Sequence, residues 1–187
     1  MADTSDIKKG LCIRFNDKVH QILDFQHVKP AKGPAFVRTK LKNLENGRII
    51  DNTFSSGIKI DIVRVEHREY QFLYKEEDGF VFMNSETFEQ ILIPEYLIEK
   101  PQFLREGDTV IIVFNADDEI PLYCELPPHI IFEVIFVEPA VKGNTANQAT
   151  KRATLDTGAE IQVPLFVNVG DRIKVNTETG EYMERVK

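Results

Sequence analysis

The chain has 187 residues, of which 42% are hydrophobic and 28% charged, and its net charge is −7. This composition is enough for a buried core, and the apolar runs are too short to span a bilayer. The acidic N-terminus is not a secretory signal, and Cys12 and Cys124 are too far apart in sequence to indicate a disulfide framework or a metal-binding pair. We therefore expect a cytoplasmic protein that needs no cofactor to fold.

The charge is distributed unevenly along the chain. Residues 1–65 carry twelve basic and seven acidic side chains, residues 66–128 carry four and fifteen, and residues 129–187 carry seven and eight. The net charges of the three segments are +5, −11 and −1. Such asymmetry indicates separate units, of which the first can face a polyanion and the second is repelled by one.

Period-two alternation of apolar residues dominates the sequence and predicts many short strands. Glycine-containing turn signals separate several of them, as at Asn46-Gly47 and Asp78-Gly79. The best helical signal is 84–92, where Asn84 or Ser85 can cap the first turn. The strands that we expect are 11–15, 18–25, 35–42, 70–74, 80–83, 109–114, 130–137, 159–163, 172–176 and 181–186.

Short strands at close spacing, with little helix, are typical of small β-barrels. One continuous barrel of this length would be unusual, and the charge changes near residues 65 and 128. The stiff Leu126-Pro127-Pro128 segment coincides with the second change. We therefore predict three all-β modules, at 1–65, 66–128 and 129–187.

The segment between the runs 18–25 and 35–42 reads as the tip of a β-hairpin. Pro30 and Pro34 cannot donate ladder hydrogen bonds, and Gly33 frees the backbone, so strand pairing is expected to stop there. Lys32 is then left at the apex, roughly 25–30 Å from the base of a hairpin with eight to ten residues in each strand. A solvated lysine in an ordinary turn remains the simpler interpretation of these residues alone.

The strand that follows the tip presents a row of cations on one face. Arg38, Lys40 and Lys42 alternate with the apolar Ala35, Val37, Thr39 and Leu41. Their spacing of about 6–7 Å suits the phosphates of a nucleic-acid strand. An edge strand that uses its cations against aggregation would show the same pattern.

A polar segment in the last module reads as a long exposed loop between two strands. Loops of small five-stranded barrels often contact nucleic acid, and the cations, amides and hydroxyls of 142–152 suit backbone contact. A merely flexible loop is equally compatible with the sequence. Within this loop the candidate contact residues are Lys142, Gly143, Asn144, Thr145, Lys151 and Arg152.

Signals for an enzyme are weak. The four histidines have no metal-ligand spacing, and the sequence contains no glycine-rich phosphate loop or nucleophile elbow. Charged turns account more simply for the acidic runs 76–78 and 117–119. We expect neither a catalytic site nor a metal site.

Several motifs together resemble one known family, bacterial translation elongation factor P. The tip Lys29-Pro30-Ala31-Lys32-Gly33 is similar to the family's Lys-Pro-Gly-Lys-Gly loop. The segment 82–90 looks like the family's middle module. The C-terminal stretches 153–159, 163–167 and 180–185 are the most specific. The resemblance covers essentially the whole chain.

The resemblance implies an N-terminal SH3-like (KOW-type) barrel and two OB-folds in an L-shaped, tRNA-like arrangement. It implies binding to the 70S ribosome beside the peptidyl-tRNA when synthesis stalls at consecutive prolines. The tip would lie near the peptidyl-transferase centre, and the loop 142–152 near the exit-site codon of the mRNA. Tyr182 and Arg185 belong to the last module, which would face the codon and the tRNA.

The resemblance also implies a role for Lys32, because many family members carry a post-translational amine extension on this lysine. A lysine-modifying enzyme would then be a further partner. Ala31 replaces the family's usual glycine, and Pro34 follows Gly33 where a small or polar residue is commoner. Both changes stiffen the loop. The residues Lys29, Pro30, Ala31, Gly33 and Pro34 would surround Lys32 at the tip.

Our leading hypothesis is a monomeric, non-enzymatic elongation factor that promotes peptide-bond formation at consecutive prolines by positioning the tRNA acceptor end. Arg38, Lys40 and Lys42 would contact RNA, and no membrane partner is expected. A general single-strand RNA-binding protein is the first alternative, but the chain has no tryptophan and few cations after residue 65. An enzyme with an unrecognised site is the second alternative.

Overall fold

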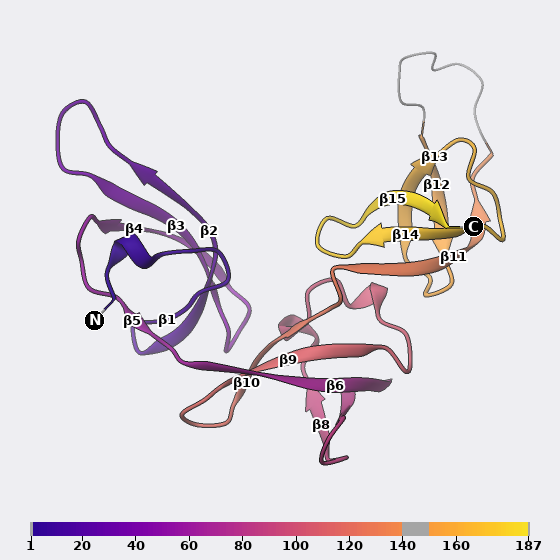
Figure 1. Cartoon of the computed structure of the whole chain (residues 1–187), viewed down its shortest axis with the longest axis horizontal. Coiled ribbons are helices and arrows are strands. Elements are labelled where there is room, and N and C mark those ends of the chain that lie inside the picture. The colour runs from indigo at the N-terminus through magenta and orange to yellow at the C-terminus, as the bar shows by residue number, and fades with distance from the viewer. Residues whose placement is uncertain (1, 140–149, 187) are drawn as a thin grey trace. The chain divides into compact units, whose positions relative to one another are not determined.

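A computed structural model describes residues 2–139 and 150–186 (Figure 1). These residues form three five-stranded sheets and three 3-10 turns, with no α-helix among them. The prediction of an all-β fold is therefore confirmed. The chain divides into two compact units, Met1–Arg68 with Ile112–Cys124 and Glu69–Ile111 with Glu125–Lys187. No described helix is long and apolar enough to cross a membrane.

The first sheet has the strand order β4-β3-β2-β1-β5. Its core consists of apolar side chains that alternate along the strands, including Ile13, Ile22, Val37 and Leu41, all at most 1% exposed. Alternation places each of these residues on one face of the sheet, so they pack together without interruption. The elements of this part are η1 (Thr4–Asp6), β1 (Cys12–Phe15), β2 (Lys18–Val28), β3 (Phe36–Asn43), β4 (Ile49–Ser55) and β5 (Asp61–Ile62).

The middle sheet has the order β10-β9-β6-β7-β8. Phe72, Phe80 and Phe82 are buried, with ring centroids 5.4–5.5 Å apart between Phe72 and each of the other two. Such tilted aromatic pairs contribute stability beyond their buried area. The elements are β6 (Val65–Glu76), β7 (Gly79–Asn84), β8 (Gln90–Ile93), η2 (Glu95–Leu97), η3 (Pro101–Phe103), β9 (Thr109–Asn115) and β10 (Pro121–Glu125).

The helix expected at 84–92 is wrong, because this segment is a turn followed by a strand. The Asn84 side chain accepts hydrogen bonds from the backbone of Glu86 and Thr87 at 2.8 and 3.0 Å, as a helix cap would. The backbone then reverses at Phe88, whose φ of +62° is left-handed. The chain returns as β8 and pairs with β7. Pairing with a neighbouring strand therefore outweighs the helical spacing of the apolar residues.

The third sheet has the order β13-β12-β11-β14-β15, and its outer strands β13 and β15 also touch each other. The core includes Phe132, Leu155, Val163 and Ile173, which are fully buried. Phe103 from η3 joins this core, with its ring 5.7 Å from that of Phe132. The strands are β11 (His129–Val137), β12 (Thr150–Leu155), β13 (Glu160–Pro164), β14 (Arg172–Asn176) and β15 (Glu181–Val186).

Every strand that alternation predicts coincides with an observed one, but β4, β5, β8, β10 and β12 were not predicted. The module boundaries at 65 and 128 remain a prediction. Phe103 lies on the N-terminal side of the second boundary although it is part of the core of the third sheet. Residues 69–111 of the second module therefore share one compact unit with the third module, and Phe103 packs into the third module's core.

Candidate functional site: a supported hairpin with a lysine tip

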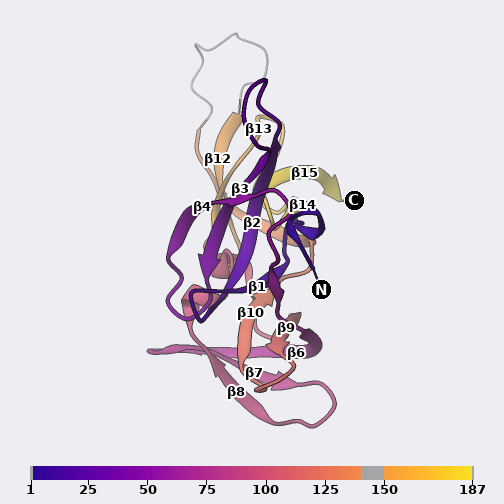
Figure 2. The same cartoon turned by 90° about the vertical axis from the view of Figure 1, so that its left-hand side faces the viewer.

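The tip that contains Lys32 is the end of the hairpin formed by β2 and β3 (Figure 1). The two strands pair from His20 with Asn43 out to Val28 with Phe36, and regular pairing then stops. All six residues from 29 to 34 are exposed, and the loop extends from the strand ends instead of folding back (Figure 2). The structure therefore places Lys32 at the accessible end of a long hairpin, together with Lys29, Pro30, Ala31, Gly33 and Pro34.

Gly33 supplies the backbone conformation that this loop needs. Its φ is +107°, which side chains rarely tolerate, whereas a Cβ atom there would meet only the Pro30 ring, at 4.0 Å. Dihedral preference, and not lack of space, therefore favours glycine at this position. The flanking Pro30 and Pro34 fix φ on either side of it.

A third strand, β4, supports the hairpin, and the sequence did not predict this strand. β4 pairs with β3 from Lys42–Ile49 out to Phe36–Ser55, and the Ser56 N–H donates to the Ala35 carbonyl at 2.9 Å. β3 therefore lies between two strands along its whole length. This excludes the interpretation of its cations as protection of an edge strand. It also means that three strands, and not two, hold the tip.

The base of the hairpin is anchored by buried side chains from both strands. Ile22 and Leu41 are fully buried in the first core. His20 is also buried: its Nδ1 lies 3.0 Å from the Lys18 carbonyl oxygen, and its Nε2 lies 3.4 Å from Nδ2 of Asn43. This histidine, which looks isolated in the sequence, therefore connects the two strands and has no open position for a ligand.

The predicted basic face is present on β3 but is not uniformly basic. Arg38 and Lys40 are exposed, whereas Lys42 is half-buried. The Arg38 guanidinium lies over the Phe36 ring, 5.5 Å from its centroid. A shallow hollow of about 350 Å³ opens beside Arg38 and Lys40.

The two exposed cations have different neighbours. Lys40 stands opposite Asp24 on β2 and Asp51 on β4, whereas Arg38 stands opposite the neutral Gln26 and Thr53. The Cβ atoms of directly opposite residues on neighbouring strands lie within about 5.5 Å of each other. The two carboxylates therefore offset the charge of Lys40. Arg38 is therefore the better placed of the two for an external anion.

The candidate residues of the last module fall into two groups. Lys142, Gly143, Asn144 and Thr145 lie outside the described residues. Residues 150–152, which were expected to end the loop, belong to β12 instead. Lys151 is half-buried there, and Arg152 forms ion pairs with Glu138 at 3.8 Å and Glu160 at 3.5 Å. The charge of Arg152 is therefore partly compensated within the sheet.

Tyr182 and Arg185 meet through a residue that sequence reasoning missed. The Phe166 ring is 6.4 Å from that of Tyr182, and the Arg185 guanidinium lies 5.7 Å from the Phe166 centroid. Phe166 is 57% exposed and follows Pro164-Leu165 beyond β13. The signal available in the sequence was its place in the stretch 163–167, to which no role was given. The three side chains lie together, and Arg185 is also paired with Asp171 at 3.5 Å, so its charge is partly compensated.

Two titratable groups away from the hairpin tip have shifted pKa values. Hydrogen bonds from the Ser5 side chain and backbone lower the pKa of Asp3. Hydrogen bonds to Glu66 and Glu119 raise the pKa of Arg68. Both shifts favour the charged form, so both groups are fixed charges near neutral pH.

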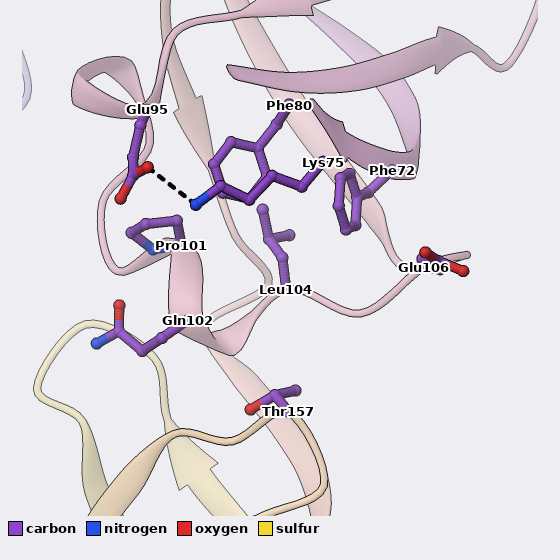
Figure 3. A pocket seen from close by; sticks show the side chains of 9 residues that line it. All are labelled: Phe72, Lys75, Phe80, Glu95, Pro101, Gln102, Leu104, Glu106 and Thr157. Carbon is purple, nitrogen blue, oxygen red and sulfur yellow. Dashed lines mark hydrogen bonds and ion pairs between the residues drawn. The ribbon is translucent and has the colours of Figure 1, made fainter. Parts of the chain in front are cut away.

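A hollow of about 420 Å³ in the second unit shows no catalytic arrangement (Figure 3). Its lysine, Lys75, is already paired with Glu95 at 3.1 Å and lies 4.9 Å from the centroid of the Phe80 ring. Among the residues that line it there is no histidine or cysteine. No group of three or more potential ligand side chains among the described residues could hold a metal ion.

Comparison with known proteins covers all three sheets. Residues 3–60 match the Elongation factor P KOW-like domain, residues 65–122 the Elongation factor P OB domain, and residues 130–185 the Elongation factor P C-terminal domain. Elongation factor P of Flavobacterium johnsoniae is 56% identical and that of Flavobacterium psychrophilum 57% identical, each over 187 residues and the full length of both chains.

A solved structure supports the fold independently. Eukaryotic translation initiation factor 5A from Methanococcus jannaschii superposes with a TM-score of 0.50 at 18% identity, covering 67% of this chain and 90% of that one. Its full-length relatives, and not this fold likeness, show that the protein is a translation factor built from small β-sheet domains, and not an enzyme. The chain belongs to the elongation factor P family.

Proposed function

We propose that this protein binds the 70S ribosome beside the peptidyl-tRNA and promotes peptide-bond formation at consecutive prolines. The observation that carries the proposal is the exposed Lys32 at the end of a hairpin whose strand β3 is paired on both sides. Because its strands are paired, such an arm can hold the Lys32 ammonium at a site far from the first sheet's core with little positional freedom. The family to which the chain belongs supplies the ribosome as the binding partner.

The proposed mechanism is positioning. Proline reacts slowly because its ring fixes φ and its nitrogen is a hindered secondary amine. A rigid arm beside the tRNA acceptor end restricts the peptidyl-tRNA to productive orientations and so lowers the entropic part of the barrier. The Lys32 ammonium contacts RNA backbone in this arrangement, and the ribosome carries out the chemistry.

We further propose that Lys32 carries an amine extension added by a lysine-modifying enzyme, which would lengthen its reach. Peptide mass spectrometry of the native protein reads such a group directly. The surface formed by Phe166, Tyr182 and Arg185 would face the tRNA and the exit-site codon, together with the segment 142–152. These contacts belong to a monomer that acts in the cytoplasm.

The different surroundings of Arg38 and Lys40 give a test of the RNA-contacting face. We expect Arg38→Gln to weaken ribosome binding and to reduce the slope of log affinity against log salt concentration by about one, as for the loss of one phosphate contact. Lys40→Gln is expected to have a smaller effect, because Asp24 and Asp51 already offset its charge.

The measurement is binding of the full chain to purified 70S ribosomes over a salt series, with both variants checked for native folding. Glutamine is chosen because it adds no third carboxylate beside Asp24 and Asp51. Affinity that does not depend on salt, or equal losses for the two variants, would contradict the electrostatic role assigned to β3.

A further inference from the structure

We infer that a hollow at the base of the hairpin, opposite the Lys32 tip, is a binding site for an unpaired RNA nucleotide. The hollow is lined by parts of the segments 16–20 and 43–50, and we call it the base hollow. Its volume is about 390 Å³, within the range of small-ligand pockets. The inference rests on the proposed function, because the ribosome and its tRNAs supply the RNA.

Two tight turns bring the sides of the base hollow together. Asn16 and Asp17 form the turn between β1 and β2, with φ values of +51° and +60°, and Phe15 pairs with Lys18 on either side of them. Asparagine and aspartate tolerate this left-handed backbone better than bulky residues do. Lys18 then reaches the turn between β3 and β4, where its Nζ lies 2.8 Å from a carboxylate oxygen of Glu45. This ion pair holds the two turns side by side.

The floor of the base hollow consists of two buried polar side chains that already have partners. Oδ1 of Asn43 accepts hydrogen bonds from the backbone N–H groups of Glu45 at 2.9 Å and Asn46 at 3.2 Å, which fixes the orientation of its amide. Nδ2 of Asn43 therefore faces Nε2 of His20, whose Nδ1 lies against the Lys18 carbonyl. The floor is thus a fixed support, and the groups that can contact a ligand lie on the rim and the wall.

The rim carries polar groups that the rest of the described chain does not engage. Neither the Asn16 amide nor the Arg48 guanidinium forms a hydrogen bond or an ion pair with a described residue. Asn46 uses its Oδ1 to accept from the Arg48 N–H at 3.0 Å, and its Nδ2 remains able to donate. Side-chain amides match the hydrogen-bonding edge of a base, and a guanidinium binds a phosphate through two parallel N–H bonds.

The wall of the base hollow is apolar. Ile49, at the start of β4, is 56% exposed, and the next residue, Ile50, is 39% exposed. β4 is the outer strand of the first sheet, so no further strand of that sheet covers them. An unpaired base that is turned out of an RNA helix packs its flat face on such side chains and forms hydrogen bonds at its edge. The wall and the rim offer both kinds of contact in one place.

The charges around the base hollow favour RNA as the ligand. The lining includes Lys18 and Arg48 but no carboxylate, whereas the hollow on the outer face of β3 includes Asp24 and Asp51. Glu45 offsets the charge of Lys18, so Arg48 is the cation left for a phosphate. A cationic site in the basic first module attracts a nucleotide and repels a basic protein segment. A nucleotide bound there would fix the base of the arm while Lys32 contacts the acceptor end.

Substitutions on the wall and the rim test the site through binding of the full chain to 70S ribosomes. We expect Ile49→Ala to weaken binding about five- to tenfold, because the base covers the exposed half of a side chain that loses three carbons. Arg48→Gln should reduce the slope of log affinity against log salt concentration by about one, as for the loss of one phosphate contact. Both side chains are exposed, so neither change should unfold the first sheet.

The matched controls lie toward the opposite edge of the same sheet. Ile62→Ala on β5 removes an isoleucine that is 40% exposed, and Arg14→Gln on β1 removes an exposed cation that is paired with Asp61 at 3.6 Å. Both should leave the affinity and the salt slope unchanged. Unchanged binding of either test variant, or equal losses in the controls, would overturn the inference.

Photocrosslinking of the full chain on stalled 70S ribosomes separates this inference from the proposed function. A benzophenone amino acid at position 49, whose rings can themselves take the face of a base, should give an RNA adduct. Primer extension then assigns the adduct to tRNA or to ribosomal RNA, and either source supports the site. A protein adduct at 49, or RNA adducts at the tip position 31 with none at 49, would overturn the base hollow and leave the proposed function standing. Absence of adducts at both positions would overturn ribosome binding itself, and the inference with it.

Discussion

Lys32→Ala is expected to abolish the relief of stalling at consecutive prolines while leaving the fold intact. The side chain is exposed and has no hydrogen bond or ion pair with a described residue, so the free energy of unfolding should change by no more than about 0.5 kcal/mol. The rate of proline–proline bond formation should fall by roughly one to two orders of magnitude, because misplacing a reacting group by 1 Å alone costs up to about 100-fold. The measurement is the rate of diproline synthesis in a purified translation system.

Two matched variants serve as controls for Lys32→Ala. Lys29→Ala removes the other exposed cation of the tip and should have a much smaller effect, because it does not lie at the apex. Lys32→Arg keeps the charge and isolates the contribution of the lysine's own shape and chemistry. Normal diproline synthesis by Lys32→Ala would refute the role assigned to the tip.

Leu41→Ala should destabilise the hairpin at its base. Leu41 is fully buried beside Ile22 and Val37, so removing three carbons leaves a cavity that costs about 3 kcal/mol, within the usual range of 2–5. This loss should raise the amide hydrogen-exchange rates of β2 and β3 by about 100-fold. Residue-resolved exchange is the suitable measurement, because it reports the first sheet separately from the others.

The control for Leu41→Ala lies on the neighbouring strand. Ile49 of β4 is 56% exposed, and Ile49→Ala should change the free energy of unfolding by no more than about 0.5 kcal/mol. Faster exchange confined to the 29–34 tip, with unchanged rates at the base, would contradict the view that the buried base anchors the arm.

Local signals in the sequence account for the hairpins and most strands. Turn glycines fix where the chain reverses, and Gly47, Gly158 and Gly180 all have positive φ. Alternation along β3 assigned Val37 and Leu41 to the core and Arg38 to the outer face. Both signals depend on one residue and its immediate neighbours, which is why the sequence suffices to predict them.

Pairing between distant segments was harder to predict. β4 contains Asp51 and Asn52, which are poor strand formers, and it is a strand because β3 offers a complete hydrogen-bonding edge. Asp51 lies beside Lys40 because of this pairing, and Asp24 lies there because β2 pairs with β3. The segment 84–92 shows the converse, since its helical spacing gives way to pairing with β7. For the same reason the sequence suggested a basic face but not which of its cations is free to bind.

The central claim is that a supported hairpin places residue 32 beside the acceptor end of the peptidyl-tRNA. Directed hydroxyl-radical cleavage from an iron chelate on Ala31→Cys tests it directly, because Cys12 and Cys124 are 3% exposed and should escape labelling. With the labelled full chain on ribosomes stalled at diproline, we expect cuts in the acceptor end of the peptidyl-tRNA and in the adjacent ribosomal RNA. Cleavage elsewhere, with the acceptor end uncut, would contradict the claim.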